Sequence, residues 1–235
     1  AWQIGVVTTD VSDAQAGVLQ GAPWIVTSEM VDSSAALLDA VDVGTDGVPP
    51  EAGLGAAVLA LSEPLRSDQN RGFRREDASL HVVVVSDNDD SSEDVLGEDP
   101  GAVFLEFLED EALATGGSAV LSAIVGDEPV GCVGKAGSAL PGSSYIEVAE
   151  SSGGTVGSVC DADLSAVVEG LGLASATWPD TFELQASPEA DTVRVELDGL
   201  RQDDGWSLAE EPPAIIFDGP PEPSAEIEVR YQVAQ

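Results

Sequence analysis

Positive charge is nearly absent from this chain of 235 residues, which has eight lysine and arginine residues against 44 aspartates and glutamates. The formal net charge is −36 at neutral pH, and Lys135 is the one lysine. Binding to bare nucleic acid needs a basic face that neutralises phosphates, so this composition argues against nucleic acid as a partner. Anionic membrane surfaces are disfavoured for the same reason.

Long apolar runs and a leader are also missing. No run approaches the ~20 residues needed to cross a bilayer, so we expect no membrane span in this chain. The chain opens without an initiator methionine, and no basic stretch followed by an apolar one marks a signal peptide. Because residues 2–9 already have the composition of a buried strand, we expect that an upstream piece has been removed.

Residues for nucleophilic catalysis are scarce. His81 is the single histidine, and the sequence offers no serine or cysteine nucleophile with a positioned base around it. No glycine-rich phosphate loop is present. Nothing selects one acid/base pair among the 44 acids. We therefore expect that the chain is not an enzyme.

What is present is a core: hydrophobic residues make up 43% of the chain, too many for a disordered polymer. β-Branched apolar segments alternate with amphipathic ones, which predicts a doubly wound, mostly parallel sheet flanked by helices over residues 1–175. The predicted strands are residues 2–9, 24–27, 80–87, 119–125 and 155–159. The predicted helices are residues 33–41, 54–65, 102–113, 145–150 and 164–171. The near-continuous run at 80–87 is typical of a strand covered on both faces.

The pattern changes near residue 175. Beyond it, alternating strands follow one another without helices, at residues 192–197, 214–217 and 226–233. Turn residues separate these strands, including an Asp-Gly pair at 198–199. The sequence therefore predicts a small all-β module over residues 177–235.

Several phrases, in this order and spacing, resemble a von Willebrand factor type A domain of the secreted or lipid-anchored bacterial branch. They are residues 2–10, 51–57, 82–90, 122–126 and 145–154, with the tail 205–231 resembling the small β module of that branch. The resemblance implies a von Willebrand A-like fold and a role in adhesion or protein binding. It also implies a metal-ion-dependent adhesion site at the top of the sheet.

Only part of that metal site is present. The Asp-x-Ser-x-Ser loop of the family is absent, and Val48 stands where a threonine ligand is expected. Asp87 occupies a ligand position, and Thr45 lies nearby but out of register. The site is thus degenerate, with no certain cofactor, although Mg²⁺ or Ca²⁺ remains open. The implied binding face comprises Asp10, Asp46, Val48, Asp89 and Asp90.

The missing loop follows the first strand of the family, which lies between the strands corresponding to residues 2–9 and 80–87. Without it, both neighbours have unpaired backbone groups, at ~1–3 kcal/mol each if buried. Either those two strands pair directly, or a strand from an upstream fragment or a partner chain fills the gap.

Two cysteines, Cys132 and Cys160, form an even pair, so we expect a disulfide, with two buried thiols as the alternative. A disulfide implies an oxidising compartment, hence a secreted or surface-anchored location.

Two charged segments have more than one interpretation. The acid-dense residues 87–94 lack the glycine and glutamate of a calcium loop, which leaves a solvated loop or a weak calcium site. The surface as a whole fits either adaptation to high salt or calcium loading. Four arginines, Arg66, Arg71, Arg74 and Arg75, either dock an acidic patch, including one on a second copy, or neutralise local repulsion.

Together these features predict a non-enzymatic, extracytoplasmic protein-binding or adhesion module. The alternative is a structural subunit of a surface assembly whose incomplete sheet is filled by another strand. Either function requires a protein partner, which could be a second copy.

Overall fold

The computed structural model describes residues 2–12, 14–44, 47, 51–135, 137–175, 181–184, 186–197, 199–210, 213–218 and 227–233. The chain divides into two compact units, Ala1–Ser175 and Ala176–Gln235. The division falls where the sequence pattern changes from α/β to all-β.

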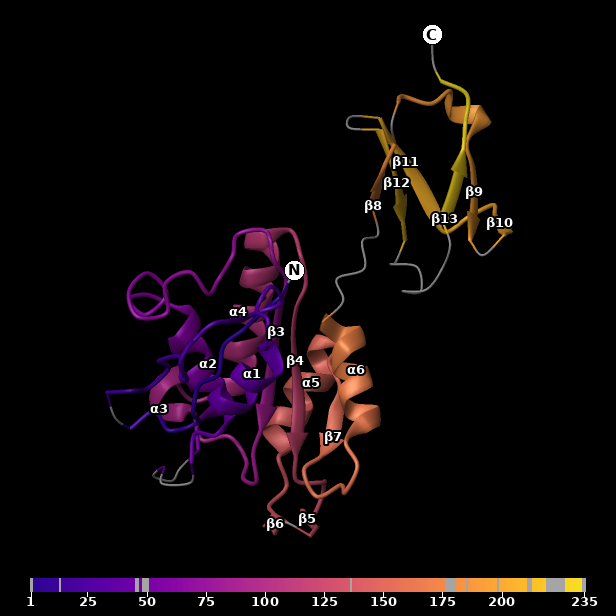
Figure 1. The fold of residues 1–235 in the computed structure, drawn as a ribbon. Helices are drawn as coiled ribbons and strands as arrows, with labels where there is room; N and C mark the ends of the chain where they lie inside the picture. The colour runs from indigo at the N-terminus through magenta and orange to yellow at the C-terminus, as the bar shows by residue number, and fades with distance from the viewer. Residues whose placement is uncertain are drawn as a thin grey trace. The chain divides into compact units, whose positions relative to one another are not determined.

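A parallel three-stranded sheet forms the centre of the first unit (Figure 1). Its order is β3 (Leu80–Val85), β4 (Ala119–Val125) and β7 (Val156–Ser158). Leu80 lies opposite Ala119, and Ala123 opposite Val156. The parallel order confirms the expected mixed α/β class.

The helices of this unit largely follow the predicted segments. They are α1 (Ser33–Val41), α2 (Gly53–Leu61), α3 (Glu93–Leu96), α4 (Pro100–Thr115), α5 (Ser143–Ser152) and α6 (Ser165–Ser175). The caps explain their starts: the carboxylate of Asp32 accepts a hydrogen bond from the Ala35 N–H before α1, and that of Asp99 accepts one from the Ala102 N–H before α4.

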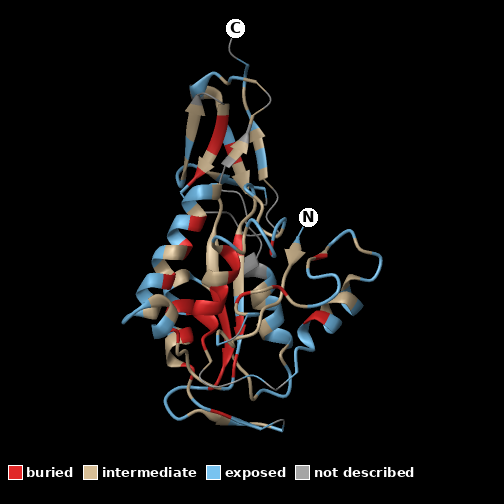
Figure 2. Cartoon of the chain, turned by 90° about the vertical axis from the view of Figure 1, so that its left-hand side faces the viewer, coloured by how far each residue is buried: buried red, intermediate tan, exposed pale blue. Residues whose placement is uncertain are grey.

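The core of the unit lies on one face of the sheet. Alternate strand residues, Leu80 and Val84 on β3 and Leu121, Ala123 and Val125 on β4, are buried on this face. Leu54 of α2, Phe104 and Leu108 of α4, and Tyr145 and Val148 of α5 pack against them. Figure 2 shows these buried residues gathered on the strands and the adjoining helices. Apolar side chains at both strand and helix spacing therefore build one contiguous core.

The other face of β3 differs from the prediction. Val83 is 41% exposed and Val85 is 60% exposed, so the expected cover on both faces is wrong for this strand. β3 is also an edge strand, because β4 is its one partner among the described strands. A continuous valine run indicates a strand, but the tertiary arrangement decides how many of its sides are covered.

The expected buried strand at residues 2–9 is also wrong in most of its length. Only β1 (Gln3–Ile4) is a strand, and it pairs antiparallel with β2 (Val26–Thr27). Trp2 is 45% exposed. Residues 5–8 form no ladder, because the described chain places no strand beside them. β1 and β3 are not paired with each other.

Helix α2 ends at Leu61, so the predicted continuation to Leu65 is wrong. Pro64 has no N–H for the helix ladder and disfavours helical geometry in the residue before it. The arginine-rich segment that follows returns to α4. There the buried Glu111 carboxylate accepts hydrogen bonds from Arg66 Nη1 at 3.0 Å and Arg74 Nε at 2.5 Å. Two of the four arginines, Arg66 and Arg74, thus form ion pairs with the same carboxylate, that of Glu111.

After β4 the chain forms a short hairpin of β5 (Cys132–Val133) and β6 (Ser138–Ala139) at the carboxyl end of β4 (Figure 1). The Leu140 N–H donates to the backbone oxygen of Asp87 at 2.8 Å. This bond joins the hairpin to the loop that follows β3.

The second unit consists of two antiparallel three-stranded sheets. One has the order β11 (Trp206–Glu210), β12 (Pro213–Phe217) and β8 (Thr181–Glu183). The other has the order β10 (Leu200–Gln202), β9 (Arg194–Leu197) and β13 (Ile227–Arg230), preceded by the 3-10 turn η1 (Ala190–Thr192). Val195 of β9 and Ile215 of β12 are fully buried together, so the two sheets share one small core.

Candidate functional site

The loop that follows β3 covers the first turn of α2. The N-cap residue of α2 is Ala52, whose side chain cannot accept a hydrogen bond. Two residues of the loop replace the missing cap. Asp90 Oδ1 accepts from the Leu54 N–H at 3.1 Å, and Ser92 Oγ accepts from the Gly55 N–H at 2.8 Å. The loop therefore satisfies helix donors that the local sequence leaves open.

Tyr145 on α5 provides the third acceptor. Its hydroxyl oxygen accepts from the Gly53 N–H at 3.0 Å, and a side chain at residue 53 would collide with this hydroxyl, because a Cβ would lie 2.7 Å from it. Burial of the ring, followed by the negative charge of Asp90, raises the pKa of Tyr145. The phenol thus stays protonated and serves as a structural link between α2 and α5.

Asp89 has a similar position at α5. Its Oδ1 accepts hydrogen bonds from the backbone N–H of Ser144, at 2.9 Å, and of Asp90, at 3.0 Å. Asp89 and Asp90 were both predicted to belong to the binding face. Each carboxylate accepts a hydrogen bond from a backbone N–H in the first turn of a helix, Asp89 at α5 and Asp90 at α2.

Asp87 is exposed, whereas Asp10 is half-buried, as Asp89 and Asp90 are. Asp87 Oδ1 accepts from Asn88 Nδ2 at 2.9 Å. Asp10 Oδ1 accepts from the N–H and the hydroxyl of Ser12, at 2.8 and 2.6 Å. The segment containing Asp10 lies near the start of α2, because the backbone oxygen of Thr9 accepts from the Ala52 N–H at 2.9 Å. The structure thus brings two of the three predicted loops, those containing Asp10 and Asp87, to the start of α2.

Three predicted residues, Thr45, Asp46 and Val48, lie outside the described residues. Within the described ranges, no group of three or more histidine, cysteine, aspartate or glutamate side chains is placed to hold a metal ion. Of the two predicted metal ligands, Thr45 lies outside the described residues, and Asp87 accepts a hydrogen bond from Asn88. The neighbouring carboxylates of Asp89 and Asp90 accept hydrogen bonds from backbone N–H groups. The geometry therefore favours a structural use of this acidic loop.

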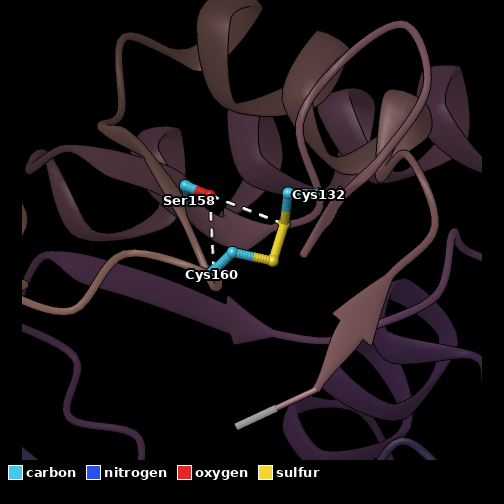
Figure 3. The surroundings of a disulfide bond; sticks show 3 residues. All are labelled: Cys132, Ser158 and Cys160. Atoms are coloured by element: carbon cyan, nitrogen blue, oxygen red, sulfur yellow. Dashed lines mark hydrogen bonds between the residues drawn. A yellow bond between two sulfur atoms is a disulfide. The ribbon is translucent and has the colours of Figure 1, made fainter. Parts of the chain in front are cut away.

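The predicted disulfide is present. Cys132 in β5 and Cys160 after β7 are bonded, with Cα atoms 6.0 Å apart. Ser158 lies beside the bond, with its hydroxyl 3.6 Å from Cys132 Sγ and 3.3 Å from the Cys160 N–H (Figure 3). The bond connects the β5–β6 hairpin to the end of β7.

A shallow hollow lies between this hairpin and the loop after β3. Its volume is about 450 Å³. Asp87 and Asn88 form one side, and Val130, Val133 and Leu140 belong to the other. Sequence analysis missed the three apolar residues. The sequence feature that could have indicated them is the segment 130–134, in which two valines alternate with glycines around Cys132.

The outer edge of β3 is the second open feature. The N–H of Leu80 donates to Ser118 and that of Ser86 to Ile124, so even-numbered residues of this segment direct their backbone groups toward β4. Val83 and Val85 therefore direct theirs away from β4. In the part of the chain that the structure describes, no backbone group pairs with them there.

His81 contacts a serine that sequence analysis did not connect with it. Its Nε2 lies 2.8 Å from Ser122 Oγ, which also accepts from the Thr155 N–H at 2.8 Å. Burial lowers the pKa of His81. Ser122 is fully buried within the sheet, so this pair is a polar link between neighbouring strands.

Comparison of the chain with protein-family models, with curated proteins and with solved structures finds no match. None of the described helices is long and apolar enough to cross a membrane.

Proposed function

We propose that this chain is a non-enzymatic, extracytoplasmic protein-binding module whose interaction surface is the open edge of β3. The edge binds a strand of a separate partner polypeptide, which completes the sheet. The observation that carries the proposal is the pair Val83 and Val85. Their backbone groups are unpaired within the described chain, and their side chains are 41% and 60% exposed.

The composition of β3 supports this use. Exposed sheet edges are usually short, or protected by charged residues, proline or a bulge. β3 has six residues, Leu-His-Val-Val-Val-Val, with no lysine, acid or proline. An added strand would pair its backbone with this edge and cover the exposed valines, which is the mode of recognition called strand addition.

The location and the general fold belong to the same proposal. The disulfide supports an oxidising compartment, because such bonds persist mainly outside the cytosol. A von Willebrand A-like fold that lacks its first strand would leave an open edge at this strand. The arrangement of β1 and β3, which are not paired with each other, is consistent with an empty position between them.

Charge indicates what kind of partner supplies the strand. The net charge of −36 disfavours a second copy of this chain at low salt. A neutral or basic partner would meet no such repulsion. A degenerate metal-dependent adhesion site is the weaker candidate, because among the described residues no group of three or more histidine, cysteine, aspartate or glutamate side chains surrounds Asp87 in a position to hold a metal ion.

Strand addition can be tested with an uncharged synthetic peptide of alternating valine and threonine. We expect binding to slow hydrogen exchange at the Val83 and Val85 amides. A Val83→Pro variant should bind at least about tenfold more weakly, because proline removes an outward N–H without disturbing the ladder to β4. The measurement is isothermal titration calorimetry combined with residue-resolved exchange.

The matched control is Val156→Pro. Val156 lies in β7 on the opposite edge of the sheet, and its backbone also points away from β4, because Thr155 and Val159 make the bonds to that strand. This variant should bind the peptide as the unchanged protein does. Equal binding by Val83→Pro, or binding that requires Mg²⁺ or Ca²⁺, would contradict the proposal.

A further inference from the structure

The hollow beside the disulfide-linked hairpin is an apolar surface that the fold does not use. Val130 is 83% exposed, Val133 is 85% exposed and Leu140 is 61% exposed. Val133 lies in β5, Val130 precedes β5 and Leu140 follows β6, and all three line a single concavity. Clustered apolar exposure of this kind marks binding surfaces more often than scattered single residues do.

The hairpin holds this surface in a fixed shape. The disulfide anchors β5 at Cys132. The Gly131 N–H donates to the backbone oxygen of Asp127 at 2.7 Å. A Cβ at Gly131 would lie 2.1 Å from the backbone oxygen of Ala139, so the two sides approach as closely as glycine allows. A preorganised surface loses little conformational entropy when it binds.

A carboxylate closes one side of the hollow. Asp87 is exposed, and the hydrogen bond from Asn88 Nδ2 reaches its Oδ1. Its Oδ2 makes no hydrogen bond within the described chain. The hollow therefore offers one open anionic acceptor beside apolar side chains, and its volume of about 450 Å³ is typical of sites that hold a small group.

We infer that this hollow binds an arginine side chain in an extended segment of a partner protein. The methylene stem would lie on Val133 and Leu140, and the guanidinium would donate to Asp87. Arginine fits better than lysine because its guanidinium is flat, weakly hydrated and able to donate two parallel hydrogen bonds to a carboxylate. The net charge of −36 favours a cationic group here and disfavours an acidic one.

This inference rests on the proposed protein-binding role but uses a surface other than the edge of β3. The hollow specifies one side chain of the partner, whereas the edge recognises its backbone. Each surface can therefore be inactivated without the other.

The test uses the peptide Ac-Gly-Val-Arg-Val-Gly-NH2 and its citrulline analogue, which keeps the shape but lacks the charge. In ¹H–¹⁵N NMR titrations of the full chain, we expect shifts confined to residues 87–88 and 130–140. Asp87→Asn should weaken binding of the arginine peptide by about tenfold or more, as loss of a charge-assisted hydrogen bond predicts. The citrulline peptide should bind as weakly to the unchanged protein.

Two variants separate the possible failures. Asp127→Asn removes the same charge from the turn that precedes the β5–β6 hairpin, at a residue that does not line the hollow, so it should leave the affinity within about twofold. Equal loss in Asp127→Asn and Asp87→Asn would overturn the inference in favour of diffuse attraction. Val83→Pro should bind the arginine peptide normally. Shifts at Val83 and Val85 in place of the hollow would overturn the inference while supporting strand addition.

Discussion

At the scale of single residues, the acidic loop after β3 shows how one side chain type serves different purposes. Sequence spacing selects Asp87, Asp89 and Asp90 together, since all three follow a buried strand. The structure separates them. Asp89 and Asp90 accept backbone N–H bonds at two helix starts, and Asp87 remains at the surface. Sequence analysis did not predict these different roles, because the helix starts that Asp89 and Asp90 cap are distant from them in the sequence.

The capping role of Asp90 gives a direct prediction. Asp90→Ala should lower the free energy of unfolding by about 1–2 kcal/mol, because it leaves the Leu54 N–H and the Ser92 hydroxyl without their acceptor. The measurement is urea denaturation followed by circular dichroism. Asp94→Ala is the control, since Asp94 is exposed on α3 and should change stability by less than about 0.5 kcal/mol.

A metal-binding role for Asp90 would give a different result. In that case Mg²⁺ or Ca²⁺ would raise the melting temperature of the unchanged protein, and Asp90→Ala would abolish the increase. The capping role predicts the same loss of stability with EDTA as without it.

At the scale of elements, the sequence pattern locates most helices and strands but leaves their neighbours undefined. The bounds of α1 and β4 agree with the predicted segments at 33–41 and 119–125. β3 has the predicted position but one covered face, and residues 5–8 have no partner among the strands that the structure describes. A run of valines favours extended backbone. The number of strands that pair with it depends on which other segments of the chain pack beside it in the fold.

The disulfide is the element-scale feature with the clearest energetic consequence. Replacing both Cys132 and Cys160 by serine should lower the free energy of unfolding by ~3–4 kcal/mol, the chain-entropy value for a loop of 28 residues. The measurement is guanidinium denaturation of the two proteins under the same conditions. Reduction of the unchanged protein should have the same effect, and stability that is insensitive to both changes would contradict a structural role.

At the scale of the whole molecule, net charge dominates. With −36 charges on 235 residues, mutual repulsion opposes the compact state unless ions screen it. Ion pairs within the protein remove little of this repulsion. Among the described residues, two of the few arginines, Arg66 and Arg74, pair with the same carboxylate, that of Glu111. Most carboxylates must therefore be balanced by solvent ions.

Screening leads to a prediction about salt. Raising NaCl from about 0.02 M to 1 M should increase the free energy of unfolding by roughly 1–3 kcal/mol. Thermal unfolding followed by circular dichroism measures this, with sucrose as an uncharged control. Millimolar Ca²⁺ should add nothing beyond its ionic strength if the acidic surface is an adaptation to salt. A saturable Ca²⁺ effect would indicate a calcium-loaded surface instead.

The sequence by itself determined the properties that depend on composition and short-range pattern. These are the acidity, the mixed α/β unit followed by a β-rich one, most helix positions, and the cysteine pair. Only the tertiary structure decided which groups meet. Ala52 cannot cap α2, so Tyr145, Asp90 and Ser92 supply the acceptors. The same holds for the open edge at Val83 and for the hollow beside Asp87, because coverage and concavity arise from contacts between distant segments, which local periodicity does not encode.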